Sequence, residues 1–224
     1  MKDFEVAERL YSVNGPDGSG KTIFVRYLAA EMASIAPTIV VKPSLFSESS
    51  ASRSIGDLFA KDVEVKKDSR VRNTYFLETL SVNYRDRVIP LLEQGYCVIL
   101  DSSEIRDVAF TKDISDELAH SDTLEWVQSG KLTHRTVAKH QVFLYSEAED
   151  LFANILARGE FGYGDPRSLE EAERRLLCYQ EAFKLFRLMA PEEVNWHYLE
   201  NPRVLNFEEQ LRLLSRRVIE GASS

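Results

Sequence analysis

The sequence is short of cysteine and histidine. Its 224 residues include two cysteines and four histidines. Cys97 and Cys178 form no Cys-x-x-Cys pair and have no histidine at metal-ligand spacing, so we expect buried, reduced thiols. The scattered histidines show no ligand spacing either, and we expect structural or surface positions for all four of them. They are His120, His134, His140 and His197. A disulfide scaffold and a cysteine or histidine metal centre are therefore not predicted.

Long apolar runs and an excess of positive charge are also missing. No run approaches the ~20 apolar residues that cross a bilayer, and the charged N-terminal segment lacks the apolar core of a signal peptide. We therefore expect no membrane association and a cytoplasmic protein. The chain has 36 acidic and 28 basic residues, a net charge of −8. A nucleic-acid partner is not predicted, because it would need a basic surface.

The composition is that of an ordinary folded chain. Hydrophobic residues make up 44% and charged residues 29% of the sequence. A chain of this length can bury a substantial core without disulfides or metals. With no repeat and no linker-like segment, we expect one domain over residues 1–224.

One stretch carries a specific signal. Residues 15–22 read Gly-Pro-Asp-Gly-Ser-Gly-Lys-Thr, which fits the pattern G-x-x-x-x-G-K-[ST] between a predicted strand (9–14) and a predicted helix (21–34). Glycines leave the amides of such a turn unshielded, and the positive end of the next helix adds to them, so the turn can hold a phosphate chain. The alternative is a glycine-rich connection with no ligand. The predicted phosphate-binding residues are Gly15, Gly18, Ser19, Gly20, Lys21, Thr22 and Ile23.

Within this turn, two side chains have expected roles. We expect Lys21 to reach the β- and γ-phosphates of ATP and the Thr22 hydroxyl to ligate Mg²⁺. Asp101 ends a predicted buried strand (97–101), where a carboxylate can hold the same ion through water. A helix-capping aspartate is the alternative for Asp101.

Strands and helices are expected to alternate along the chain. Four further apolar segments predict strands at 38–41, 97–101, 141–145 and 196–199, and predicted helices lie at 53–61, 75–93, 147–156, 168–188 and 207–218. We expect a charged connection over 62–72 and mixed polar sequence over 103–140, with helical pieces near 114–118 and 124–127. The fold class is thus α/β: a P-loop NTPase with a five-stranded parallel sheet and helices on both faces.

A lid is expected at residues 158–167. This segment holds three glycines, one proline and two arginines in ten residues. A closing flap that brings Arg158 or Arg167 over the phosphates would supply positive charge and exclude water, which phosphoryl transfer needs. The alternative for both arginines is an exposed surface position.

These residues resemble the thymidylate kinases. The resemblance rests on the phosphate loop with Asp17, on residues 90–95 leading into the strand that ends at Asp101, and on residues 108–111. It continues in residues 158–162 and in Asn195-Trp196, so it spans nearly the whole chain. It implies a nucleoside monophosphate kinase that uses ATP and Mg²⁺, with dTMP as the leading acceptor, and it implies a homodimer.

The resemblance also implies roles for individual residues. Lys21, Asp17 and Arg158 would be catalytic, with Asp17 on the sugar 3′-hydroxyl of the acceptor and Arg158 near the donor. The expected acceptor-binding residues are Asp17, Arg53, Phe76 and Arg106. For Phe76 the alternative is an ordinary core position, because aromatic residues on a helix usually pack in the interior.

Three departures from the family lie on the acceptor side. Ser102-Ser103 follow Asp101 where the family has an arginine, and Arg106 is a candidate replacement. Arg85 is moved one position along its helix, which turns its side chain by ~100°. Arg53 matches the family's arginine only with a gap. The alternatives are therefore an ATP-dependent kinase for a modified nucleotide or another phosphorylated metabolite, or an inactive nucleotide-binding module.

Overall fold

The structure, a computed structural model, describes most of the chain. The described residues are 4–61, 68–114, 116–159, 161, 165–201, 209, 212, 213, 215, 216, 218 and 219. Parts of three predicted segments lie outside them: the connection over 62–72, the lid over 158–167 and the closing helix over 207–218. The described residues of the last segment are helical from residue 209 to 219.

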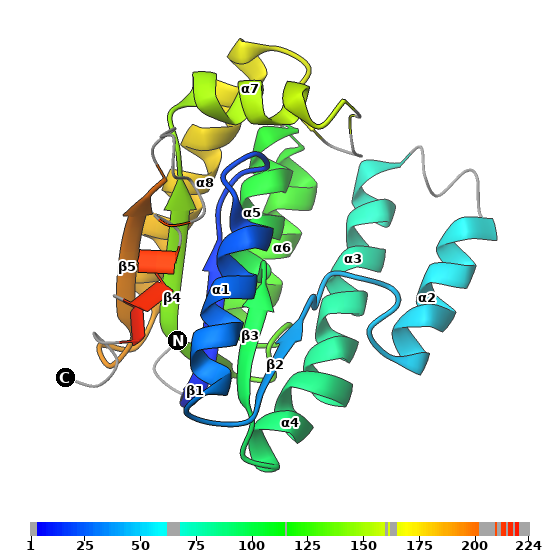
Figure 1. Cartoon of the computed structure of the whole chain (residues 1–224). Helices are drawn as coiled ribbons and strands as arrows, with labels where there is room; N and C mark the ends of the chain where they lie inside the picture. Colours follow the sequence, from blue (N-terminus) through cyan, green and yellow to red (C-terminus); the bar gives the residue numbers. More distant parts are fainter. Residues whose placement is uncertain are drawn as a thin grey trace.

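A five-stranded parallel sheet forms the centre of the molecule, as predicted (Figure 1). Its strands lie in the order β2-β3-β1-β4-β5. Because the chain turns to opposite sides of β1 in its successive crossovers, the carboxyl end of β1 is the topological switch point, where open α/β sheets bind ligands. The strands are β1 (Glu5–Asn14), β2 (Thr38–Val41), β3 (Cys97–Asp101), β4 (Thr136–Tyr145) and β5 (Asn195–Glu200).

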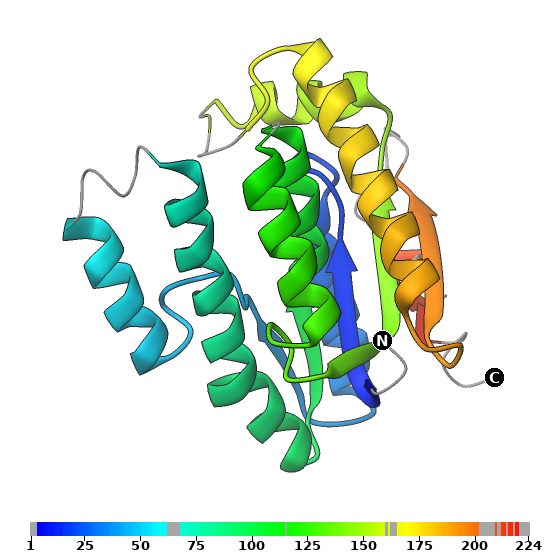
Figure 2. The same cartoon turned by 180° about the vertical axis from the view of Figure 1, so that it is seen from behind.

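Helices cover both faces of this sheet (Figures 1 and 2). Helix α1 packs on one face; α3, α5 and α8 pack on the other, and α6 packs on α3 and α5. Helix α2 contacts α3 at the side, and α7 lies at the carboxyl end of the strands. The helices are α1 (Lys21–Ala33), α2 (Ser50–Lys61), α3 (Ser69–Asn83), the π-helical segment η1 (Tyr84–Val88), α4 (Ile89–Glu93), α5 (Glu104–Asp113), α6 (Glu117–Ser129), α7 (Ala148–Ala157) and α8 (Leu169–Met189).

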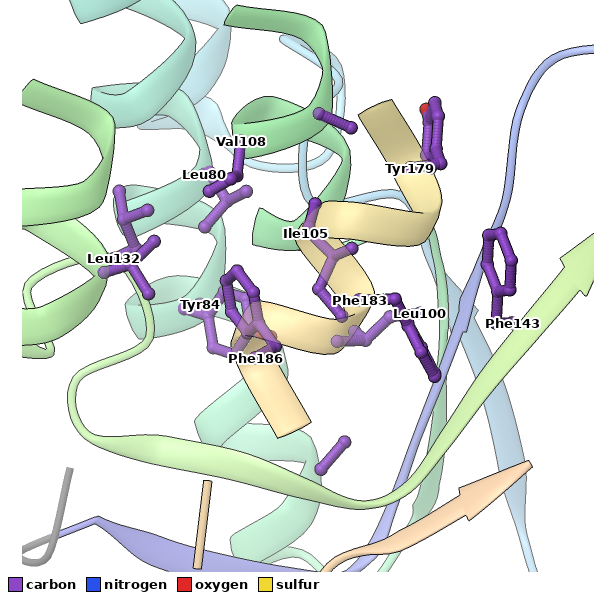
Figure 3. Close-up of a cluster of buried hydrophobic side chains, with 14 of the residues drawn as sticks. Leu80, Tyr84, Leu100, Ile105, Val108, Leu132, Phe143, Tyr179, Phe183 and Phe186 are labelled. Carbon is purple, nitrogen blue, oxygen red and sulfur yellow. The ribbon is translucent and has the colours of Figure 1, made fainter. Parts of the chain in front are cut away.

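The strands separate two apolar clusters because their side chains alternate between the faces. In β3, for example, Val98 and Leu100 join the larger cluster, whereas Cys97 and Ile99 face α1. Figure 3 shows the larger cluster, in which Tyr84 meets side chains of α5 and α8. Both cysteines are buried free thiols, as predicted.

Several strands and helices differ from their expected bounds; α2 begins three residues early, and the expected helix over 75–93 is divided into α3, η1 and α4. β1 begins at Glu5 and β4 at Thr136, four to five residues earlier than predicted, and a bulge interrupts their pairing between Ala7 and Tyr11. The region 103–140 contains two full helices, α5 and α6. The apolar pattern of α5 is weak because its inner face buries polar side chains as well as Ile105 and Val108. Helix α3 begins at Ser69, and the Asp68 carboxylate accepts hydrogen bonds from two amides of its first turn. The connection that was expected over 62–72 therefore ends before Ser69.

Over the part of the chain that the structure describes, no helix is long and apolar enough to span a bilayer. The same residues contain no group of three or more metal-binding side chains of histidine, cysteine, aspartate or glutamate.

Candidate active site

The phosphate loop joins β1 to α1 at the switch point of the sheet. Gly15, Gly18 and Gly20 have φ of 150°, 87° and 88°, values that favour glycine. A Cβ at Gly15 would lie 1.9 Å from the Leu144 carbonyl oxygen, and one at Gly18 would lie 2.4 Å from the Leu151 carbonyl oxygen. The loop backbone therefore packs directly on the end of β4 and on α7, with no room for a side chain.

Two asparagines hold the loop from outside. Asn154 Nδ2 donates to the Gly18 carbonyl at 2.9 Å, and Asn201 Nδ2 donates to the Ser19 carbonyl at 2.8 Å. These bonds fix the orientation of two successive peptide groups. The sequence pattern of the loop did not identify either residue, since one lies on α7 and the other directly follows β5.

The inner side of the loop is suited to an anion. Helix α1 starts after Gly20, which supplies no side-chain cap, and its first turn has no acidic residue. Ser19 Oγ is buried without a hydrogen-bond partner among the described residues. A bound phosphate chain would accept hydrogen bonds from the amides at the start of α1, because helix N-terminal amides favour negative charge.

A cavity of about 500 Å³ opens in front of the loop. Gly15 and Ser19 are buried and do not line it, but the other predicted loop residues do. The predicted lining residues are Asp17, Gly18, Gly20, Lys21, Thr22, Ile23, Asp101, Arg106 and Arg158. The sequence reasoning missed Lys42, Ser44, Leu45, Ser102 and Asn154, which also line it. A basic residue directly after a buried strand was the available signal for Lys42.

Lys21 points into this cavity from the first turn of α1. Its Nζ donates to the Pro16 carbonyl at 2.8 Å and lies 3.9 Å from Asp17 Oδ1. Burial lowers the pKa of Lys21, and the carboxylates of Asp17 and Asp101 oppose this effect. A polyphosphate in the cavity would add further negative charge beside the ammonium and raise its pKa toward the ordinary value.

The end of β3 is fixed by polar contacts. Asp101 is buried and pairs with Lys42, with 2.9 Å between Oδ2 and Nζ. Asn14 Oδ1 accepts from the Ser103 amide at 3.0 Å and from its hydroxyl at 3.1 Å. Between them, Ser102 has φ of 75°, an uncommon conformation for a residue other than glycine and one that clusters at functional sites. Asp101 caps no helix: Ser103 is the N-cap of α5.

A smaller cavity of about 70 Å³ lies among α3, α5 and α8. It shares Asp17 and Arg106 with the large cavity, so the two cavities adjoin. Its lining combines aromatic rings and charges: Asp17, Phe76, Arg106, Asp107, Phe110, Arg175 and Tyr179. Phe76 thus lines a cavity, while it also contacts Phe46 and Phe59.

Asp107 is the unusual group of the smaller cavity. Its Oδ2 is buried without a hydrogen-bond partner among the described residues. Burial raises its pKa to about 6, although Arg106 lowers it. Across the cavity, Arg175 pairs with Asp113 at 2.7 Å and lies 3.8 Å from Asp17 Oδ2. The sequence pattern missed both Asp107 and Arg175, because polar residues inside helices give no sign of burial.

The arginines expected on the acceptor side separate into two groups. Arg106 lines both cavities, and its Nη1 donates to Ser44 Oγ at 2.9 Å. Arg53 is exposed on α2 and lines neither cavity. Arg85 is exposed on η1 and pairs with the adjacent Asp86. Of Arg85 and Arg106, the structure places Arg106 at the two cavities, so Arg106 stays the candidate for the arginine that is missing after Asp101.

The two lid arginines also differ. Arg158 lines the large cavity and pairs with Asp165 at 2.9 Å. Arg167 stacks over the ring of Phe161 at 4.5 Å and does not line that cavity. Residues 160 and 162–164 of the expected lid lie outside the described residues.

The residues present fit ATP and Mg²⁺. The unfilled donors of the loop suit phosphate oxygens, and the oxygen ligands that Mg²⁺ prefers are offered by Thr22 and Asp101 on the wall of the same cavity. The four cationic side chains of the cavity, Lys21, Lys42, Arg106 and Arg158, face two carboxylates, Asp17 and Asp101. This balance favours an anionic ligand.

Fold and site together define an α/β protein with a P-loop, and solved structures share this fold. One is a deoxyadenosine kinase from M. mycoides with bound dCTP: TM-score 0.63, 14% identity, covering 94% of this chain and 99% of that one. Another is a deoxyadenosine kinase from M. mycoides with the products dCMP and a flexible dCDP. The TM-score is 0.62 and the identity is 15%, and the match covers 94% of this chain and 98% of that one. At this identity the likeness shows the shared fold alone. No protein-family model and no curated protein matches the sequence.

Proposed function

We propose that the chain is an ATP-dependent kinase that transfers the γ-phosphoryl group to a nucleoside monophosphate. The observation that carries the proposal is the set of four cations, Lys21, Lys42, Arg106 and Arg158, around one cavity that begins at a phosphate loop. Phosphoryl transfer depends on positioning and on charge stabilisation, and this arrangement offers both.

The acceptor in this proposal already carries a phosphate. A sugar hydroxyl would need a general base within hydrogen-bond reach, whereas a phosphate oxygen needs cations and no base. The described carboxylates of the large cavity are both near cations: Asp101 pairs with Lys42, and Asp17 lies near Lys21 and Arg175. The acceptor side offers Arg106 and Lys42, which suits a dianion.

Each residue has a role in the transfer. The loop amides and Lys21 hold the β- and γ-phosphates, and Arg158 approaches them from the lid segment. Arg106 orients the acceptor phosphate. One oxygen of the acceptor phosphate attacks the γ-phosphorus as the bond between the γ-phosphorus and the β,γ-bridging oxygen breaks. ADP leaves with that oxygen, so the charges balance without a proton transfer. Mg²⁺, when held by Thr22 and Asp101, supplies charge neutralisation of the phosphates.

The acceptor base is a separate part of the proposal. The resemblance to thymidylate kinases makes dTMP the leading acceptor, with Asp17 on the sugar 3′-hydroxyl and Phe76 beside the base. Asp107 Oδ2, which has no hydrogen-bond partner among the described residues, favours a second candidate: a monophosphate whose base carries an amino group. A carboxylate accepts hydrogen bonds, and an amino group donates them. Thymine, in contrast, offers one N–H, which lies between two carbonyls. A homodimer belongs to the same resemblance-based proposal, and the cytoplasmic location expected from the sequence composition is proposed with it.

The structures with the shared fold favour one further candidate. Both are deoxyadenosine kinases by their descriptions, so an unphosphorylated nucleoside is the alternative acceptor. This candidate requires Asp17 or Asp101 to act as general base at the acceptor hydroxyl. Loss of Arg106 would then affect turnover less than loss of either carboxylate.

A coupled ADP-release assay tests these candidates with purified protein, ATP and Mg²⁺. The panel contains dTMP, dCMP, dAMP, dGMP, their ribose forms and the matching nucleosides. We expect stimulation by at least one monophosphate and none by the nucleosides. Stimulation by nucleosides alone would replace the proposal with the nucleoside kinase. ATP binding by calorimetry without turnover of any acceptor would identify an inactive nucleotide-binding module instead.

A further inference from the structure

The loop after β2 is held rigidly at the wall of the large cavity. The Lys42 amide donates to Glu48 Oε1 at 3.0 Å. Asn83 Nδ2, at the end of α3, donates to the carbonyls of Pro43 at 2.8 Å and Leu45 at 2.9 Å. Since these bonds fix the backbone, the Lys42 side chain is the part of this loop that can move.

The Lys42 side chain lies between the Asp101 carboxylate and the open space of the large cavity. Its Nζ is 2.9 Å from Asp101 Oδ2, and its side chain is 42% exposed whereas that of Asp101 is 8% exposed. On the same wall, Ser44 Oγ accepts from Arg106. Lys42 can therefore turn from the buried carboxylate toward the open cavity beside Arg106 without any movement of the backbone.

We propose that Lys42 neutralises Asp101 while the site is empty and moves to the acceptor phosphate when Asp101 takes the metal of the bound ATP. This inference rests on the proposed function, because it assumes a phosphorylated acceptor. It makes Lys42 a specificity-determining residue and couples the binding of the two substrates.

The physical reason is that a buried carboxylate needs a counter-charge. A buried, unpaired Asp101 would be costly, so Lys42 stays on it in the empty site. A divalent ion at Asp101 replaces that counter-charge and repels the ammonium, so Lys42 becomes available to an anion in the cavity. By linkage, the acceptor then raises the affinity for the metal–nucleotide by the same factor.

The alternative is that the Lys42–Asp101 pair only stabilises the ends of β2 and β3. In that case the acceptor would bind equally well with and without the metal. Loss of Lys42 would lower the free energy of unfolding and would leave the acceptor affinity unchanged. The two explanations thus differ in binding, which can be measured without turnover.

The experiment is calorimetric titration of the protein with the monophosphate that is most active in the panel, or with dTMP if none is active. The titration is done with a non-hydrolysable ATP analogue, in excess Mg²⁺ and again in EDTA. We expect at least about fivefold tighter acceptor binding with Mg²⁺ in the wild type. In Lys42→Met the ratio should fall to about one, and Lys42→Arg should keep it. Lys139→Met removes an ion pair between Lys139 on β4 and Glu8 on β1; it is the matched control and should keep the wild-type ratio.

The outcomes separate the two proposals. If no monophosphate binds under any condition, the proposed function fails and the inference fails with it. If a monophosphate binds and is turned over but its affinity is independent of Mg²⁺ in the wild type, the inference alone is overturned. This wild-type comparison can overturn the inference even if Lys42→Met does not fold, and Lys42→Arg then tests whether a cation at this position keeps the ratio. A Lys42→Met protein with the wild-type ratio would also overturn it.

Discussion

The two halves of the site differ in how their residues are arranged along the chain. The half proposed to bind the donor, called the donor half, is built mainly from one contiguous stretch, residues 15–23, with Asp101 and Arg158 added by neighbouring elements. The acceptor half takes Phe76 from α3, Arg106 from α5 and Tyr179 from α8. The difference shows why a contiguous motif predicts its own geometry, whereas a wall assembled from three helices depends on their packing.

The halves also differ in their buried charges. In the donor half, burial lowers the pKa of a cation, Lys21. In the proposed acceptor half, burial raises the pKa of an acid, Asp107, to about 6; outside both cavities, burial raises the pKa of Glu104 to about 7. The proposed donor half thus holds a buried cation beside the cavity, whereas the proposed acceptor half holds a buried acid.

The largest expected effect is that of Lys21→Ala, which tests the donor half. We expect kcat to fall by ~10²–10³-fold, because one preorganised charge at the transferring group is lost. Steady-state kinetics with the best acceptor measures it. Lys184→Ala, exposed on α8, is the control and should keep the wild-type rate. An unchanged kcat in Lys21→Ala would reject the role given to this lysine.

The next effect concerns stability and a buried acid behind the site, Glu104. Glu104 is buried at the start of α5 and accepts a hydrogen bond from the Tyr84 hydroxyl at 3.3 Å, and burial raises its pKa from 4.5 to about 7. The folded state therefore keeps a proton that the unfolded state loses between these values, so this group lowers the stability as pH rises from about 4.5 to about 7. Such a difference corresponds to up to about 3 kcal/mol.

Glu104→Gln removes this ionisation. We expect its free energy of unfolding to equal that of the wild type below about pH 4.5 and to exceed it by up to about 3 kcal/mol above pH 7. Urea unfolding at pH 4.5, 6 and 8 measures the difference. Glu78→Gln, an exposed change on α3, should show no such trend. A difference in the free energy of unfolding that does not change with pH would contradict the raised pKa of Glu104.

The third prediction compares two arginines of the acceptor half. Arg106→Met should raise the acceptor KM by about tenfold or more while changing the ATP KM little, because a charged hydrogen bond to the acceptor is worth about 1.5–3 kcal/mol. Arg85→Met should leave both constants near the wild-type values, since Arg85 is exposed and paired with Asp86. Equal effects of the two changes would show that the cavity next to Arg106 does not hold the acceptor.

The smallest expected effect is that of Arg53→Ala. Arg53 matched an acceptor-binding arginine only through a gap, and it is exposed on α2 outside both cavities. We expect less than a twofold change in the acceptor KM, measured in the same assay. An increase of tenfold would indicate that α2 closes over the acceptor during turnover and brings Arg53 to it.

Much of the fold could be predicted from the sequence. The β-branched run of β2 and the apolar run of β3 predicted their bounds, because buried parallel strands are apolar on both faces. The early parts of β1 and β4 were missed because residues such as Glu8 and Lys139 interrupt the apolar pattern there. Helix α5 was missed because it buries polar side chains, which periodicity does not detect. The single domain over 1–224 stays a prediction.

The sequence by itself determined the phosphate loop, because its glycine positions, Lys21 and Thr22 are neighbours in the chain and local backbone geometry brings them together. It also determined the α/β class, through the alternation of apolar strands with helices. Only the tertiary structure decided which polar side chains meet: Lys42 with Asp101, Arg106 with Ser44, and Arg175 near Asp17. These partners are 59 to 158 positions apart in the chain, so their contacts depend on how the sheet and helices pack.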